Sequence, residues 1–148
     1  AGIDRVYQPG PLEVAIKLKP SRKGFLLFNL NPASVLFLWG SHSPGKSFHP
    51  SRFVTQLKAV IENGEVRTVA KRARDRTLEL GIRPYLEKEP RDLLFAELFP
   101  PRPTLVLIEE PGTAACAFGP SSDRIVKGGP FRARGAAAGP ARRAARPG

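Results

Sequence analysis

The sequence has no methionine, one cysteine, one tryptophan and two histidines among its 148 residues. Because Cys116 is the only cysteine, an intramolecular disulfide is excluded, which fits a reducing compartment and favours a cytoplasmic location. Cys116 stands between alanines and close to a phenylalanine, so we expect a small buried hydrophobe and not a reactive thiol. The two histidines, His42 and His49, have no cysteine or carboxylate near them in the sequence, and this spacing predicts no metal site.

Long apolar runs and catalytic motifs are missing as well. No stretch approaches the run of about 18 apolar residues that a membrane helix needs, and the first residues show no signal-peptide pattern. The sequence contains no Gly-rich phosphate loop, and Ser43 and Ser47 have no evident general base beside them. We therefore expect no enzyme activity, no cofactor, no small-molecule substrate and no membrane partner.

Acidic residues are missing from the last part of the chain. Lysine and arginine number 24 against 13 aspartate and glutamate, which gives a formal net charge of +11. All acids lie at or before Asp123, and from Gly128 onward arginine is the only charged residue type. This balance favours polyanionic partners such as RNA, DNA or the ribosome, the alternative being ordinary solubility charge in an arginine-rich proteome.

The residues that are present support a folded domain. Hydrophobic residues make up 41% of the chain, which is long enough for one domain with a core. Apolar residues in the segment between Pro50 and Asn63-Gly64 recur with a helical period, so we expect one packed helix at about 51–63. Short runs, mostly alternating with period two, predict strands at 3–8, 12–19, 25–28, 35–39, 66–70, 77–82, 92–99, 104–108 and 115–118.

These elements predict an α+β fold: a mainly antiparallel β-sandwich or flattened barrel with one packed helix. The strand at 104–108 is almost wholly apolar, so we expect it to be central and buried. We expect the domain to span residues 1–130. Residues 131–148 consist almost entirely of Gly, Ala, Pro and Arg, and we expect them to form a disordered basic tail.

The most basic loop lies between two of the predicted strands. Its charged residues are Lys71, Arg72, Arg74, Asp75 and Arg76. Rigid strands on both sides fix these side chains and lower the entropy cost of each contact, which makes the loop a candidate phosphate-binding device. Asp75 can orient a neighbouring arginine or accept a hydrogen bond from a sugar hydroxyl or base edge. The alternative is a solvated turn whose ion pair contributes well under about 1 kcal/mol.

The order and spacing of several segments resemble the NFACT family, which includes the RqcH ribosome quality control factors, also called FbpA or fibronectin-binding proteins. Residues 3–9, Ile-Asp-Arg-Val-Tyr-Gln-Pro, are similar to the family's Asp-Arg/Lys-hydrophobic-Tyr-Gln-Pro segment, and residues 26–32 to its segment ending in Asn/His-Pro. The helix before Gly64 is similar to a family helix that ends in Glu-Gly-Gly. The pair Asp75-Arg76 resembles the family's Asp-Arg pair at the expected spacing from Glu62.

This resemblance covers residues 1 to about 130. It implies the N-terminal domain of such a protein, with a fold similar to the N-terminal domain of formamidopyrimidine-DNA glycosylases. It also implies a role at stalled translation, because family members bind the large ribosomal subunit carrying peptidyl-tRNA and engage tRNA for untemplated alanine tailing. In the family the Asp-Arg pair is associated with tRNA, so Asp75 and Arg76 are the candidate tRNA-binding residues. Further candidate phosphate contacts are Lys71, Arg72, Arg74 and Arg5.

Two alternatives stay open. The older family name suggests a surface adhesin that binds fibronectin, and such a protein would need export. The related fold suggests a glycosylase-like DNA enzyme or DNA-binding domain, whose chemistry uses an N-terminal proline amine with a neighbouring glutamate. The first three residues, Ala1-Gly2-Ile3, do not match that pattern.

Overall fold

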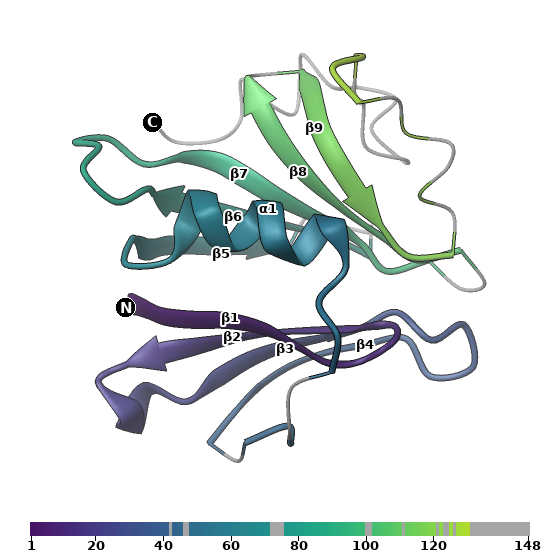
Figure 1. Cartoon of the computed structure of the whole chain (residues 1–148), viewed down its shortest axis with the longest axis horizontal. Helices are drawn as coiled ribbons and strands as arrows, with labels where there is room; N and C mark the ends of the chain where they lie inside the picture. Colours follow the sequence, from purple (N-terminus) through teal and green to yellow (C-terminus); the bar gives the residue numbers. More distant parts are fainter. Residues whose placement is uncertain are drawn as a thin grey trace.

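The computed structural model describes residues 1–41, 43–45, 48–71, 76–99, 102–110, 112–120, 122, 125 and 127–130. These residues form nine strands, one α-helix, α1 (Arg52–Ile61), and a short 3-10 turn, η1 (Ser21–Lys23) (Figure 1). The strands are β1 (Gly2–Gly10), β2 (Glu13–Lys19), β3 (Phe25–Asn29), β4 (Leu36–Gly40), β5 (Glu65–Lys71), β6 (Thr77–Arg83), β7 (Arg91–Glu97), β8 (Thr104–Glu110) and β9 (Thr113–Phe118). The predicted tail, residues 131–148, lies outside the described residues.

All nine strands belong to one antiparallel sheet in the order β4-β3-β2-β1-β5-β6-β7-β8-β9. The sheet thus consists of two meanders, β1–β4 and β5–β9, which meet where Gly2 of β1 pairs with Glu65 of β5. The predicted α+β class with mainly antiparallel strands and one packed helix is confirmed. In detail the strands form a single open sheet with a narrow junction, where the sequence suggested two layers or a closed barrel.

Helix α1 packs its apolar face against the sheet. Ser51 caps the helix, since its hydroxyl accepts the backbone N–H of Val54 at 3.3 Å, and Asn63 follows the helix with a positive φ of 68°. The ring of Phe53 lies 5.6 Å from the ring of Phe118 in β9. One hydrophobic core therefore includes the helix and both meanders, with buried side chains such as Ile16 of β2 among them.

The strand predicted at 104–108 is present and buried, but it is not central. It forms part of β8, which lies between β7 and the edge strand β9. Its side chains are nevertheless covered on both faces: Leu105 and Leu107 belong to the main core, and Val106 and Ile108 belong to a smaller cluster on the other face. An apolar run therefore indicated burial on two faces and not a position in the middle of the sheet.

Candidate nucleic-acid interface

The predicted basic loop connects β5 to β6, and its two ends are fixed to the sheet. Lys71 is the last residue of β5 and pairs with Leu78 of β6. The carbonyl of Arg76 accepts the backbone N–H of Leu98, directly after β7, at 2.7 Å. Both charged side chains are exposed. Arg72, Arg74 and Asp75 lie outside the described residues, so the pairing of Asp75 with a neighbouring arginine stays a prediction.

The antiparallel order brings other cations to the same end of the molecule. The end of β5, the start of β6, the end of β7, the start of β8 and the end of β9 share one edge of the sheet. Arg102 lies on the connection between β7 and β8, where its backbone N–H donates to the carbonyl of Phe99 at 2.8 Å. Arg52 begins α1 beside Phe53, whose ring contacts Phe118 at the end of β9. Both arginines are exposed.

We call Arg52, Lys71, Arg76 and Arg102 the cationic end of the sheet. Among the described residues at this end, Glu97 at the end of β7 is an acid, and it is fully buried, with a relative exposure of 0%. The exposed charge of these described residues is therefore positive. Such a concentration of cations on one edge creates a potential that attracts a polyanion.

The opposite end of the β5–β9 meander has a mixed charge. The carboxylate of Glu65 interacts with Arg67 and lies 3.6 Å from the guanidinium of Arg83. The hydrogen bond from Arg67 is the main cause that lowers the pKa of Glu65 below its usual value. Arg91 lies 3.6 Å from the carboxylate of Glu87. Arginines at this end are thus balanced by acids, which makes the two ends of the meander electrostatically different.

Arg5 is not part of the cationic end. It lies on β1 in the other meander, where it pairs with Lys17 of β2. Its guanidinium carbon lies 4.9 Å from the centre of the Tyr7 ring, a cation–π geometry. The structure therefore separates Arg5 from the loop with which the sequence grouped it.

No individual role was predicted for Gln8, although this residue positions the start of α1. Its side chain is 3% exposed, and its Oε1 accepts the backbone N–H of Ser51 at 2.8 Å. Its Nε2 donates to the backbone carbonyl of Pro11 at 3.2 Å. The backbone carbonyl of Gln8 accepts the N–H of Phe48 at 2.6 Å. The signal in the sequence that pointed to this residue was a glutamine placed directly before a proline at the end of an alternating strand. Gln8 thereby holds the turn from which Arg52 projects.

The other end of the helix is tied to the same strand. The Oε2 atom of Glu62 accepts the backbone N–H of Val6 at 2.8 Å, and Asn63 donates its N–H to the carbonyl of Ile3 at 3.0 Å. Both helix ends are therefore bonded to β1. Thus Ile3, Val6 and Gln8 of the segment at residues 3–9 hold the helix on β1.

Two features can be assessed in the part of the chain that the structure describes, a cluster of metal ligands and a membrane-spanning helix. Within it, no cluster of three or more His, Cys, Asp or Glu side chains is arranged to hold a metal ion. Nor does any helix in this part have the length and apolar character needed to cross a membrane.

Solved structures with a similar fold include two streptococcal proteins. One is the N-terminal domain of fibronectin-binding protein PavA from Streptococcus pneumoniae, with a TM-score of 0.72, 16% identity, and coverage of 89% of this chain and 54% of that one. The other is the N-terminal part of the fibronectin/fibrinogen-binding protein from Streptococcus suis, with a TM-score of 0.71, 16% identity, and coverage of 88% and 52%. At such identities the likeness establishes the fold.

A third similar structure is the fibrinogen binding protein from Staphylococcus aureus, with a TM-score of 0.69, 18% identity, and coverage of 89% of this chain and 49% of that one. The chain thus spans about half the length of these solved chains. Among curated proteins, no sequence match was found. A family model described as the NFACT N-terminal and middle domains matches residues 1–115 of the 148, and the chain belongs to this family.

Proposed function

We propose that this chain is an RNA-binding module of a cytoplasmic ribosome quality control factor of the RqcH type. In this role it binds the large ribosomal subunit carrying peptidyl-tRNA and engages tRNA for untemplated alanine tailing. Membership of the NFACT family supports this class of function. In the proposed role the chain acts through binding and not through an enzyme reaction of its own.

The observation that carries the proposal is the difference in charge between the two ends of the β5–β9 meander. Among the described residues, exposed cations gather at the end that holds Lys71 and Arg76, whereas acids such as Glu65 lie beside the arginines of the far end. Cations fixed on strand ends are suited to phosphates, since roughly half to two-thirds of protein–DNA hydrogen bonds go to phosphates and sugars. Asp75, in the same loop, is proposed to orient Arg76 or to accept a hydrogen bond from the tRNA.

Titration of labelled tRNA tests the RNA-binding part of this proposal. Phosphate contacts release counterions, so the logarithm of the affinity should fall linearly with the logarithm of the salt concentration. We expect measurable binding at low salt and a slope that corresponds to a few phosphates. An absence of salt-sensitive tRNA binding at low ionic strength would remove the basis for the proposal. Duplex DNA of equal charge serves as the competitor that separates tRNA engagement from a DNA-binding role.

Co-sedimentation tests the ribosomal part separately. Large subunits that carry peptidyl-tRNA and empty large subunits are each mixed with the chain and pelleted. We expect the chain to pellet more completely with the subunits that carry peptidyl-tRNA, because the tRNA adds contacts to those of the subunit. Equal recovery on both, or recovery on neither, contradicts the assignment to stalled ribosomes even if free tRNA is bound.

A surface role in binding fibronectin or fibrinogen is the second candidate, and the names of the three similar structures favour it. In this role the chain would bind immobilised fibronectin or fibrinogen. Both candidates are compared in one assay by adding excess tRNA to chain captured on fibronectin. Saturable fibronectin binding that tRNA does not displace supports the surface role.

A further inference from the structure

Strand β4 lies at the edge of the sheet and lacks the features that commonly prevent an edge strand from pairing with another strand. It ends the sheet order, so among the described residues no segment pairs with its outer edge. Its sequence, Leu-Phe-Leu-Trp-Gly, contains neither a charged residue nor a proline, the two devices with which edge strands commonly block further pairing. Within the described part of the chain, the outward backbone N–H and C=O groups of this edge thus have no strand beside them.

The side chains of β4 are exposed on both faces of the sheet. Leu36 and Leu38, which pair with Asn29 and Leu27 of β3, are 40% and 50% exposed. Trp39 points to the other face and is 52% exposed, and its Nε1 donates to the carbonyl of Lys23 at 2.8 Å. A partner resting on one face would cover only one of these groups. A strand added beside β4 would cover both, because its side chains alternate between the faces.

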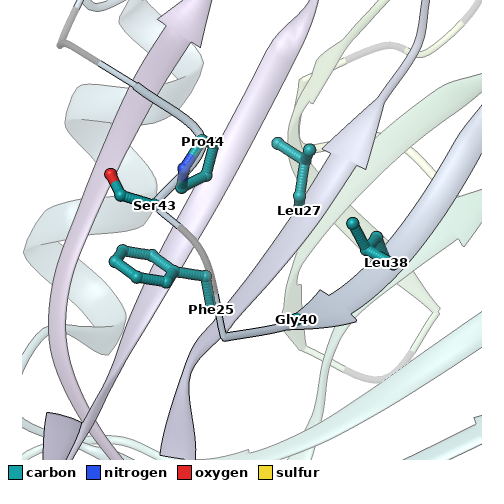
Figure 2. Close-up of a pocket in the computed structure, with 6 residues that line it drawn as sticks. All are labelled: Phe25, Leu27, Leu38, Gly40, Ser43 and Pro44. Carbon is teal, nitrogen blue, oxygen red and sulfur yellow. The ribbon is translucent and has the colours of Figure 1, made fainter.

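A shallow pocket adjoins this edge on the face of Leu38. Its volume is about 180 Å³, and it is formed by the side of β3, the end of β4 and the segment that follows β4 (Figure 2). The lining residues are Phe25, Leu27, Leu38, Gly40, Ser43 and Pro44. Peptides that add a strand to a sheet edge take affinity from main-chain hydrogen bonds and specificity from such pockets for alternate side chains.

The charges around β4 indicate which kind of partner strand would bind at this edge. Between Pro20 and Pro50 the charged residues are Arg22, Lys23 and Lys46, with no acid. Arg22 and Lys23 are exposed in η1, and this turn is held against the end of β4. Gly24 comes so close that a Cβ atom added there would lie 2.2 Å from the carbonyl oxygen of Gly40. Cations beside an apolar edge complement a partner with acidic residues, and the net charge of +11 disfavours a second copy.

From these observations we infer that β4 is a docking site for an extended segment of another protein, in which apolar and acidic residues alternate. The segment pairs with the free edge of β4. Its apolar side chains lie on the face of Leu38, where one of them enters the pocket. Its acidic side chains lie on the face of Trp39, near Arg22 and Lys23, because Trp39 bonds to the carbonyl of Lys23. This interaction is distinct from the proposed RNA contacts, which lie on the β5–β9 meander.

The single tryptophan of the chain reports on this site, since Trp39 is the only one. The probe is a short blocked peptide in which valine alternates with glutamate. A strand placed beside Trp39 should change its fluorescence emission in a saturable way. Two control peptides carry lysine in place of glutamate, or a central proline that breaks strand pairing. We expect each control peptide to bind at least about tenfold more weakly than the acidic peptide.

Variants of the protein locate the binding. Leu38→Lys places a charge on the edge and should lower the affinity for the acidic peptide by at least about tenfold. Leu36→Lys is a second variant on the same face, in case the first disturbs the fold, and circular dichroism monitors both. Leu86→Lys is the matched control, because Leu86 is 84% exposed on the loop between β6 and β7. This control should bind the peptide like the parent.

Four results overturn the inference. The first two are the absence of a Trp39 response to the acidic peptide and equal binding of the lysine or proline peptide. The third is peptide binding that Leu38→Lys and Leu36→Lys leave unchanged in folded protein, and the fourth is a dimer of the chain that Leu38→Lys abolishes. Sedimentation of the parent without peptide detects the last case, in which a second copy is the occupant of β4.

Discussion

The side-chain oxygen of Gln8 accepts the backbone N–H of Ser51 at 2.8 Å, and this bond joins residues 43 positions apart in the sequence. Ser51 is the cap of the one α-helix in the described part of the chain, so a residue of β1 determines where this helix begins. The helix in turn contributes Arg52 to the cationic end of the sheet. Through this contact the first strand helps to position a cation that lies far from it along the chain.

Replacement of Gln8 should therefore destabilise the fold. In Gln8→Ala the N–H of Ser51 loses its acceptor in a place largely closed to water, which typically costs about 1–3 kcal/mol. Urea unfolding measures the change in the free energy of unfolding. Gln56→Ala, the same substitution at a half-buried helix position, is the control and should cost much less. Equal losses for the two variants would mean that the Gln8 contact has no special importance.

The thiol of Cys116 should react slowly in the folded protein. Burial raises its pKa from 9.0 to about 11, a shift that lowers the thiolate fraction near pH 8 by about 100-fold. Alkylation by iodoacetamide at this pH, followed by mass spectrometry, should be slow in buffer and fast in urea. As the pH rises from about 9 to 11, the unfolded chain releases the thiol proton first, so this group then disfavours folding. Equal alkylation rates in buffer and urea would contradict the claim that burial in the folded protein suppresses the reactivity of this thiol.

Removal of a buried hydroxyl should stabilise the protein. The Oγ1 atoms of Thr77 and Thr104 are buried and have no hydrogen-bond partner among the described residues, and both threonines pair with Glu97 of β7. Thr104→Val keeps the shape of the side chain and removes an unpaired polar atom, so we expect a gain of about 1 kcal/mol in urea unfolding. The exposed Thr68→Val in β5 should stay within about 0.5 kcal/mol of the parent. A loss of stability in Thr104→Val would indicate that this hydroxyl has a partner.

Replacement of Asp75 distinguishes specific tRNA engagement from simple attraction between a cationic protein and an anionic RNA. Asp75→Ala removes one negative charge, so the net charge rises from +11 to +12. Attraction alone predicts tighter tRNA binding, whereas an acid that orients Arg76 or contacts the RNA predicts weaker binding. We expect weaker binding with an unchanged fold, measured by tRNA titration and thermal unfolding. Binding as tight as the parent's would show that the role proposed for Asp75 is wrong.

Much of the fold follows from local patterns in the sequence. The helix predicted at 51–63 forms at Arg52–Ile61, and the alternation of 12–19 matches β2, because periodicity directly reflects which face is buried. Periodicity does not determine which strand becomes the neighbour of another. Hence the narrow junction at Gly2 and Glu65 and the edge position of β4 could not be predicted.

Site residues were harder to predict, because charge in a sequence does not indicate position in space. Lys71 and Arg76 were predicted as candidates and lie together at the loop ends. Arg52 and Arg102 join them only through the sheet topology, and Arg5, predicted with the loop, lies in the other meander. The role of Gln8 depends on a contact 43 positions away, which a single sequence does not reveal.

The most direct test of the central claim compares two variants of equal charge. Lys71→Gln/Arg76→Gln/Arg102→Gln alters the cationic end, and Arg22→Gln/Lys23→Gln/Lys88→Gln alters exposed cations elsewhere. Each removes three charges, so both have a net charge of 11 minus 3, or +8. In tRNA titrations over a salt series, we expect the first variant to lose at least about tenfold in affinity with a shallower salt slope, and the second to stay near the parent. Equal losses in the two variants would contradict the account, because binding would then follow the total charge and not the cationic end.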